Sequence, residues 1–407
     1  MELFSLGDLY LSDFLAKDEE PRCSPVELKL LYDEDTKAVR LETPADPDFM
    51  YGRYWYRSGI NTSMQEELKG IVESVNKVKK LRPSDTWLDI ACNDGTLLSY
   101  VSEDVYRVGI DPVDDTFKAE ADTHSNYIVQ DYFSKTAWDS IPNSEERRAD
   151  VVTCIAMFYD LDDPKPFLDD VYKVMRDDGL FVLQMSYTPL MLKQIAFDNI
   201  CHEHIYYYTF LTIEAVLKNS GFKVMDVQLN DVNGGSFRIY IMKDIGDETK
   251  FATQPYRDVC RFRTQSIRVM EAADGSNDSL AWGYFHGRIE ALKEETVAFI
   301  KQAKSEGKTV WGYGASTKGN TLLQYFGLDN TLIDGIAERS PYKFGLRTIG
   351  TNIPIESEEV MREAKPDYLL VLPWHFISEF VEREQAFLIG GGQFIVPCPV
   401  FKVIGAN

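Results

Sequence analysis

Short apolar runs alternate with amphipathic stretches along most of this chain, and that alternation constrains its fold more than any other feature. Residues 64–80 carry Leu68, Ile71 and Val75 at helical spacing, and the apolar run TWLDIAC follows soon after. The later apolar runs are VYRVGID, ADVVTCIAM, GLFVLQMSY, FKVMDVQL and FRIYIMK, with helices predicted near 166–175 and over 212–219. This order predicts an α/β fold built on an open, largely parallel sheet covered by helices.

A second series of the same kind occupies the end of the chain. It begins with KTVWGYGA and continues through TLIDGIAE, DYLLVLP and GGQFIVPCP, after a long charged stretch that we expect to be helical. We therefore predict a small N-terminal appendage over 1–60, a first α/β domain over 61–245, a helical connector over 246–306 and a second α/β domain over 307–407. The length of 407 residues fits this division, because single hydrophobic cores stop growing beyond roughly 250–300 residues.

Charge and composition exclude several classes of function. The chain has 43 Lys and Arg against 65 Asp and Glu, and the resulting net charge of −22 repels the phosphates of nucleic acids and of anionic membranes. No apolar run approaches the roughly 20 residues that cross a bilayer, and the N-terminus lacks the pattern of a signal peptide. The six cysteines form no CxxC pair, so neither a disulfide framework nor a structural zinc site is indicated. We predict a cytoplasmic protein with a small-molecule substrate, and nothing in the sequence indicates its oligomeric state.

The stretch LDIACNDGT runs from an apolar strand into small and turn-forming residues that let a ligand approach the backbone closely. The next strand ends in Asp111, placed to accept hydrogen bonds from ribose hydroxyls, and the run QDYF suits an adenine edge and face. The set is similar to the S-adenosylmethionine (SAM) pocket of class I methyltransferases, although a plain α/β turn with a solvated aspartate is the alternative. The predicted cofactor-binding residues are Asp89, Ala91, Asn93, Gly95, Asp111, Gln130 and Asp131.

The stretch CHEHIYYY holds two of the five histidines of the chain. An imidazole is suited to removing a proton near neutral pH, and the carboxylate of Glu203 can orient the ring of His204 or favour its protonated form. Metal binding by His202 and His204 is disfavoured, because residues i and i+2 present their side chains to different sides and no third ligand is evident. Packing of a loop is the other alternative, and we expect the tyrosines at 206–208 to pack rather than react.

Two glycine-rich turns complete the candidate sites. The run NGGSFR offers donors from Asn233, Ser236 and Arg238 for hydroxyl or phosphate oxygens, although Asn-Gly is also the commonest signal for a hairpin turn. The run VWGYGASTKGN leads a strand into a helix whose N-terminus can hold an anion, with Lys318 as a phosphate partner and Glu338 ending the next strand. A dinucleotide site is the rival interpretation, but the spacing departs from GxGxxG.

In this order the stretches resemble the nucleotide-sugar C-methyltransferase family, whose members methylate ring carbons of keto-deoxysugars bound to a nucleoside diphosphate. The segments that carry the resemblance are YWYRSG, LDIACNDGTLL, HEHIYYY, NGGSFRIY, GYGASTKGNTLL and ERSPYKFGLRTIGTNIPI. The resemblance implies a class I methyltransferase Rossmann-like domain followed by a second Rossmann-like domain that holds part of the nucleotide sugar. It also implies a catalytic pair of Glu203 and His204 and a substrate-side hydroxyl of Tyr56. The substrate residues expected from it are Asn233, Ser236, Arg238, Tyr313, Lys318, Asn320, Glu338 and Lys343.

The chain departs from that family at three places. Members usually open with a four-cysteine zinc module, of which this chain keeps only Cys23, so we predict no metal. Cys201 stands where a tyrosine is common, and Tyr159 stands where a histidine is common. We predict that His204, oriented by Glu203, takes a proton from the sugar, that Tyr56 and His202 stabilise the enolate oxygen, and that the carbon then accepts the methyl group of SAM. Methylation of a sugar oxygen, epimerisation, or binding without turnover are the alternatives.

Overall fold

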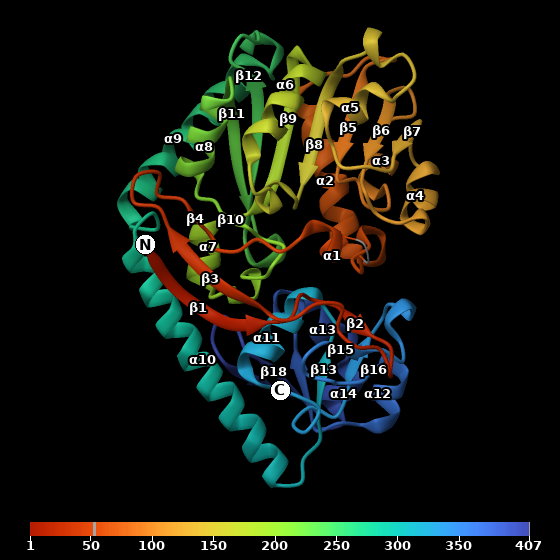
Figure 1. Cartoon of the computed structure of the whole chain (residues 1–407), viewed down its shortest axis with the longest axis vertical. Coiled ribbons are helices and arrows are strands. Elements are labelled where there is room, and N and C mark those ends of the chain that lie inside the picture. Colours follow the sequence, from red (N-terminus) through yellow and green to blue (C-terminus); the bar gives the residue numbers. More distant parts are fainter. Residues whose placement is uncertain (52–53, 407) are drawn as a thin grey trace.

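The computed structural model describes residues 1–51 and 54–406, and it divides into two α/β bodies joined along one side by a long helix (Figure 1). A small antiparallel sheet from the N-terminus lies beside the junction of the two bodies. Both predicted α/β units are therefore present, as is the class I methyltransferase type of sheet in the first of them. No helix within the described ranges is long and apolar enough to cross a membrane.

The first body is built on a seven-stranded sheet in the order β11-β12-β9-β8-β5-β6-β7, in which only β12 runs antiparallel to its neighbours. Every residue of β5 is buried, as expected for a parallel strand covered on both faces. The strands are β5 (Thr86–Ile90), β6 (Tyr106–Ile110), β7 (Tyr127–Val129), β8 (Ala149–Ile155), β9 (Met175–Ser186), β11 (Phe222–Asn230) and β12 (Ser236–Lys243).

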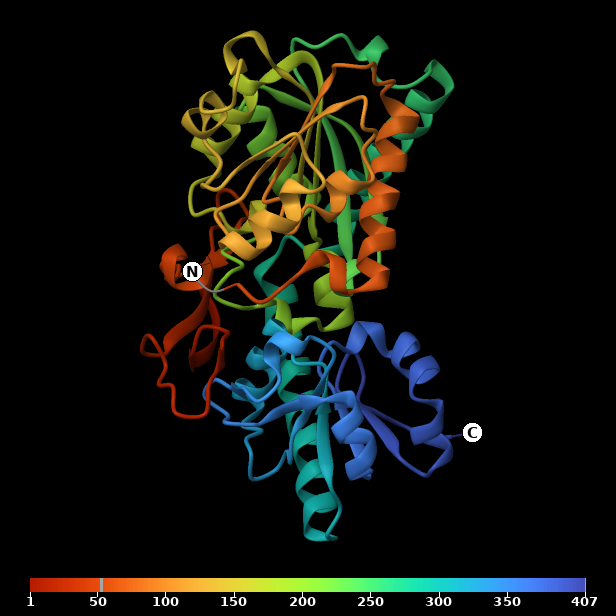
Figure 2. The same cartoon turned by 90° about the vertical axis from the view of Figure 1, so that its right-hand side faces the viewer.

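Helices cover both faces of this sheet (Figure 2). Helix α2 buries the apolar stripe that predicted it, and the Asn61 side chain caps its start by accepting a hydrogen bond from the Ser63 amide. The helices of this body are α2 (Thr62–Val78), α3 (Thr96–Ser99), α4 (Asp115–Asp122), α5 (Lys135–Asp139), α6 (Pro164–Val174), α7 (Thr188–Gln194) and α8 (Phe210–Asn219).

The second body has a six-stranded sheet in the order β16-β14-β13-β17-β18-β19, parallel except for the last strand. Its strands are β13 (Val310–Tyr313), β14 (Ile336–Glu338), β16 (Ile355–Ser357), β17 (Tyr368–Val371), β18 (Gln393–Val396) and β19 (Lys402–Ile404). Its helices are α11 (Thr317–Phe326), α12 (Glu358–Ala364), α13 (Ile377–Arg383) and α14 (Gln385–Ile389).

The N-terminal segment is more ordered than its turn-rich sequence indicates. Strands β1 (Glu2–Leu9), β3 (Val26–Tyr32) and β4 (Val39–Leu41) form a sheet whose fourth strand, β10 (Tyr206–Tyr207), comes from the first body. The short strand β2 (Phe14–Leu15) pairs instead with β15 (Arg347–Thr348) of the second body. The segment also contains the short helix α1 (Pro47–Tyr51). It therefore contacts both bodies.

The stretch predicted as a connector holds two long helices, α9 (Gln254–Asp274) and α10 (Ser279–Ser305). Helix α9 packs against β11 and α8 of the first body, and α10 descends along the second body (Figure 1). Trp282, Phe285 and Ile289 of α10 share one hydrophobic core with the N-terminal sheet and the second body. These helices thus form part of the walls of the two bodies.

Candidate active site

One cavity of about 430 Å³ lies where the two bodies face each other. In the first sheet the strand order reverses beside β5, and the cavity is lined by residues that follow β5 and β8, including Ala91 and Met157. In the second sheet the order reverses beside β13, and the cavity is lined by Lys318 and His375, which follow β13 and β17. Ligands of open α/β sheets bind at such reversal points, beyond the carboxyl ends of the strands. Here the reversal points of both sheets open into the same cavity.

The wall formed by the first sheet carries the predicted cofactor turn. Ala91 and Asn93 have φ values of 59° and 53°, so residues that replace two usual glycines adopt the left-handed backbone that glycine would favour. The Asn93 and Val113 amides donate to the two carboxylate oxygens of Asp111 at 2.7 and 3.1 Å. Asp89, Ala91, Asn93 and Asp111 all line the cavity.

Two carboxyl groups of this wall are strongly desolvated. Burial raises the pKa of Asp89 to about 7, although a hydrogen bond from the Thr153 hydroxyl at 2.6 Å opposes the shift. Burial also raises the pKa of Asp111, against its two amide donors. Groups of this kind are suited to hydrogen bonding with neutral hydroxyls or with a cationic ligand.

The other predicted cofactor residues lie behind the wall. Gly95 begins α3 with φ of 77°, and a β-carbon there would lie 2.7 Å from the Ala121 α-carbon. Gln130 donates to the Val113 carbonyl at 2.8 Å, and Asp131 accepts from the Tyr132 amide at 2.7 Å. None of the three lines the cavity, whereas Tyr132 and Phe133 do.

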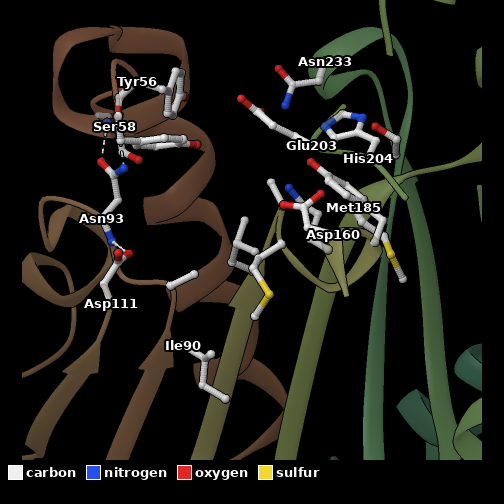
Figure 3. Close-up of a pocket in the computed structure, with 18 of the residues that line it drawn as sticks. Tyr56, Ser58, Ile90, Asn93, Asp111, Asp160, Met185, Glu203, His204 and Asn233 are labelled. Atoms are coloured by element: carbon white, nitrogen blue, oxygen red, sulfur yellow. Dashed lines mark hydrogen bonds between the residues drawn. The ribbon is translucent and has the colours of Figure 1, made fainter. Parts of the chain in front are cut away.

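The opposite wall carries the two acid–base groups. Figure 3 shows Glu203 and His204 across the cavity from Tyr56, Ser58 and Asn93. The Nδ1 atom of His204 lies 2.9 Å from the Asn199 carbonyl oxygen. Because a carbonyl only accepts, Nδ1 carries the hydrogen and Nε2 is left with a free lone pair. We predicted that Glu203 orients the ring of His204, but the main-chain carbonyl of Asn199 holds the ring instead.

Burial and a neighbouring cation keep this imidazole neutral. His204 is only 5% exposed, and burial together with the charge of Lys318 holds its pKa well below 6.5. Burial raises the pKa of Glu203, with Lys318 opposing the shift. Lys318 donates to the side-chain oxygen of Asn199 and is the one Lys or Arg among the described residues that line the cavity. A neutral base, a carboxyl group with a raised pKa and a cation therefore share one wall.

Tyr56 lines the cavity across from His204, whereas His202 does not line it. Tyr56 lies against the cofactor turn, where its carbonyl accepts from the Asn93 side chain at 2.9 Å, and Figure 3 shows it on the side away from His204. The Nε2 atom of His202 bonds to the Val26 carbonyl at 3.0 Å, and the ring lies outside the cavity lining. His202 therefore joins the reactive turn, which spans residues 201–205 and carries His204, to the N-terminal sheet.

Some of the predicted substrate residues reach the cavity and some do not. Asn233, Ser236 and Lys318 line it. Arg238 is buried in the first body, where it pairs with Glu67 and donates to Gln184. The Asn-Gly turn does join two antiparallel strands, β11 and β12, so the hairpin interpretation is confirmed.

The remaining predicted substrate residues are bonded within the second body or to the N-terminal segment. Tyr313 donates to Glu384 at 2.8 Å, and Lys343 donates to the Ala315 carbonyl at 2.7 Å. Glu338 accepts from the Ala315 amide at 2.8 Å, and Asn320 donates to the Ser12 hydroxyl at 2.9 Å. None of these four lines the cavity.

Sequence reasoning did not select Asp160, Asp198 and His375, all of which line the cavity. Burial raises the pKa of Asp198 to about 6, and burial with the Lys318 charge lowers that of His375 to about 3. Tyr159 packs its ring against His204 with centroids 4.1 Å apart. Tyr159, Asp160 and His375 all follow the carboxyl ends of parallel strands, and that rule was the signal that could have found them.

Cys201 also belongs to this turn. Its Sγ atom, a carboxylate oxygen of Glu203 and a ring nitrogen of His204 all lie within 4.8 Å of one another. The two histidines at 202 and 204 point apart, as their spacing predicted. We found no further metal ligand near the histidines in the sequence, but the thiol of Cys201 lies close to Glu203 and His204 in the structure.

Comparisons with known proteins match both bodies. Residues 60–227 match the model of a methyltransferase domain, and residues 231–399 match that of a C-methyltransferase C-terminal domain. The chain is 27% identical to C-methyltransferase NovU of Streptomyces niveus over 363 residues, which is 89% of this chain and 84% of that protein. These matches identify a SAM-dependent methyltransferase that is similar to C-methyltransferases.

Solved methyltransferase structures resemble part of the chain. Magnesium protoporphyrin IX methyltransferase ChlM from Synechocystis PCC 6803, with bound S-adenosylhomocysteine (SAH), has 14% identity and a TM-score of 0.34, covering 47% of this chain and 90% of that one. The plantazolicin methyltransferase BpumL in complex with SAH has 11% identity and a TM-score of 0.34, covering 44% and 82%.

The cofactor of this methyltransferase is SAM, and the first wall fits it chemically. The left-handed turn at Ala91 and Asn93 lines the cavity just beyond the end of β5. Each oxygen of Asp111 accepts one backbone amide and retains a lone pair for a ribose hydroxyl. Leu97, Met157 and Phe133 add apolar surface for an adenine ring.

Proposed function

We propose that this enzyme methylates a carbon next to the carbonyl of a nucleoside-diphosphate keto-sugar. The observation that carries the proposal is the free Nε2 of a neutral, buried His204 facing a cavity that the cofactor turn also lines. A C–H carbon becomes a nucleophile only when a base removes a proton that a neighbouring carbonyl has made acidic. An unprotonated base next to a cofactor site can remove that proton.

In the proposed reaction His204 Nε2 accepts the proton, and the electron pair of the broken C–H bond moves into an enolate. Glu203 lies close enough to favour the imidazolium that forms. Lys318 supplies positive charge for the enolate oxygen from the same wall. SAM, which the turn at Ala91 and Asn93 and the carboxylate of Asp111 would hold, would supply a methyl group on a positively charged sulfur that keeps the electron pair of the carbon–sulfur bond.

The nucleotide end of the substrate is proposed to lie toward the second body. Ser316 and Thr317 line the cavity at the N-terminus of α11, where backbone amides and the positive helix end favour a diphosphate. Asn233 and Ser236, from the turn between β11 and β12, are proposed as contacts to sugar hydroxyls. On this arrangement the sugar spans from the second body to His204.

Analysis of the product tests the proposal. The protein is incubated with SAM and a panel of nucleoside-diphosphate keto-deoxysugars, and the product is weighed by mass spectrometry and its methyl group located by NMR. One added methyl on carbon supports the proposal, while a methyl on oxygen assigns an O-methyltransferase instead. Solvent deuterium entering the sugar while SAM is not consumed assigns an epimerase, and no change with any sugar removes the proposed substrate class.

A further inference from the structure

The turn that carries the proposed base also brings together three potential metal ligands. The His204 amide donates to the Cys201 carbonyl at 3.1 Å and closes the turn. Sulfur, oxygen and nitrogen donors from Cys201, Glu203 and His204 then lie within 4.8 Å of one another. Zinc accepts this combination of donors with bonds of about 2.0–2.3 Å, so its ligand atoms lie roughly 3.5 Å apart. Metal binding therefore requires the three side chains to rotate toward one another.

The surroundings of His204 are those of a zinc-ligating histidine. Such a histidine normally donates its second ring N–H to a carbonyl or carboxylate, which fixes the ring and frees the other nitrogen for the metal. Asn199 accepts that hydrogen bond here. Glu203 and His204 both face the cavity, so a fourth coordination position is open toward it (Figure 3).

The charges near the turn permit a divalent cation. Lys318 opposes it, but Glu203 and a Cys201 thiolate together carry two negative charges, and the carboxyl groups of Asp160 and Asp198 line the same cavity. Cys201 is a buried free cysteine. Metal binding breaks its S–H bond, forms a zinc–sulfur bond and releases the proton to solvent.

We propose that Cys201, Glu203 and His204 form a Zn²⁺ site whose occupation switches off methyl transfer. Zinc bound to Nε2 of His204 occupies the lone pair that would accept the substrate proton. The binding half of the inference is independent of the reaction, and the inhibition half rests on the proposed function. Cys201 supplies the ligand that makes the site selective for a soft cation, because hard cations such as Mg²⁺ do not favour thiolate.

Cobalt spectroscopy tests the binding half. Titration of the full chain with Co²⁺ is expected to give a thiolate-to-cobalt charge-transfer band that saturates at one equivalent and disappears when Zn²⁺ is added. The band is expected in Cys23→Ser, whose thiol lies outside the site, and not in Cys201→Ser or Cys201→Ala. No band in the unaltered protein, or a band that survives in both Cys201 variants, overturns the site.

Methyl-transfer assays test the inhibition half. Zn²⁺ is expected to stop turnover of the unaltered protein, and a chelator is expected to restore it. Cys201→Ser is expected to keep its basal turnover and to need at least about 10-fold more Zn²⁺ for the same inhibition. Equal sensitivity of the two proteins overturns the switch. A protein that shows the cobalt band but methylates no sugar argues against the proposed function and leaves the metal site standing.

Discussion

A single main-chain carbonyl decides which nitrogen of His204 can act as a base. Asn199 holds the hydrogen on Nδ1, which leaves the lone pair on Nε2 of a ring that lines the cavity. The adjacent Tyr159 ring limits how the imidazole can turn. The orientation of the base therefore depends on packing and on one hydrogen bond, and not on a carboxylate as in a catalytic triad.

Replacing His204 tests this assignment directly. His204→Gln keeps a similar volume but has no basic nitrogen, so kcat is expected to fall by about 100- to 10,000-fold. The matched control is His124→Gln, which alters a histidine at the end of α4 away from the cavity. Steady-state kinetics with the same keto-sugar measure both variants. Turnover close to that of the control would show that another group takes the proton.

The pH dependence of the reaction tests the role of Lys318. Its positive charge adds to burial in lowering the pKa of His204, so the imidazole is unprotonated at neutral pH. Lys318→Met removes a charge that disfavours the imidazolium, which raises the pKa of His204 and moves the acid limb of the kcat profile to higher pH. Lys318→Arg keeps the charge and is expected to move the limb less. An unchanged limb in the methionine variant would contradict this coupling.

At the scale of elements, much of the α/β framework follows from the sequence. The apolar run at 86–92 contains β5, and the helical pattern at 64–80 overlaps α2. A strand buried on both faces and a helix buried on one face leave different sequence patterns, so both could be predicted. The small residues at 91–95 correctly predicted a turn between β5 and α3, and Ala91, Cys92 and Asn93 of this turn line the cavity. These signals are local, and local patterns can be read without knowing the tertiary contacts.

Contacts between distant segments could not be predicted in the same way. Strand β10 is only two residues long, and its partner β4 lies in a region of weak periodicity. Tyr313, Glu338 and Lys343 resembled substrate ligands in sequence, but each is satisfied by groups within the second body. Whether a polar side chain points to a cavity or to a buried partner depends on packing that the sequence pattern does not encode.

The turn between β5 and α3 offers a test at this scale. Gly95→Ala must place a β-carbon close to Ala121 while holding a positive φ, so the free energy of unfolding is expected to fall by at least about 1 kcal/mol. Gly70→Ala is the matched control, because Gly70 lies inside α2 with open space beside it and is expected to gain about 0.5–1 kcal/mol. Denaturant unfolding measures both. A stable Gly95→Ala protein would contradict the close approach.

At the scale of the whole molecule, the N-terminal segment joins the two bodies. It pairs with the first body through β4 and β10 and with the second through β2 and β15. Asp13 adds a buried carboxylate that accepts from the Trp55 indole at 2.8 Å and pairs with Arg22. The apolar side chains of this sheet share a core with the second body. The relative position of the two walls of the cavity depends on these contacts.

Removing residues 1–20 is therefore expected to uncouple the bodies. The truncated chain loses β1 and β2, and calorimetry is expected to show two separate unfolding transitions where the intact chain shows one. Methyl transfer is expected to fall as well, because the cavity is lined from both bodies. A single transition in the truncated protein would show that α10 and the direct contacts of the two bodies suffice.

The register of the N-terminal sheet has a further consequence. Tyr206 pairs with Arg40 and Tyr207 with Val39, and the reactive turn ends immediately before this pair of residues. Because side chains alternate along a strand, inserting one residue near position 38 would shift or reverse the face that β10 presents. The pairing of β4 with β10 thus helps to set the position of His204. An insertion in β4, which is far from His204 in sequence, is expected to displace the imidazole from its place in the cavity.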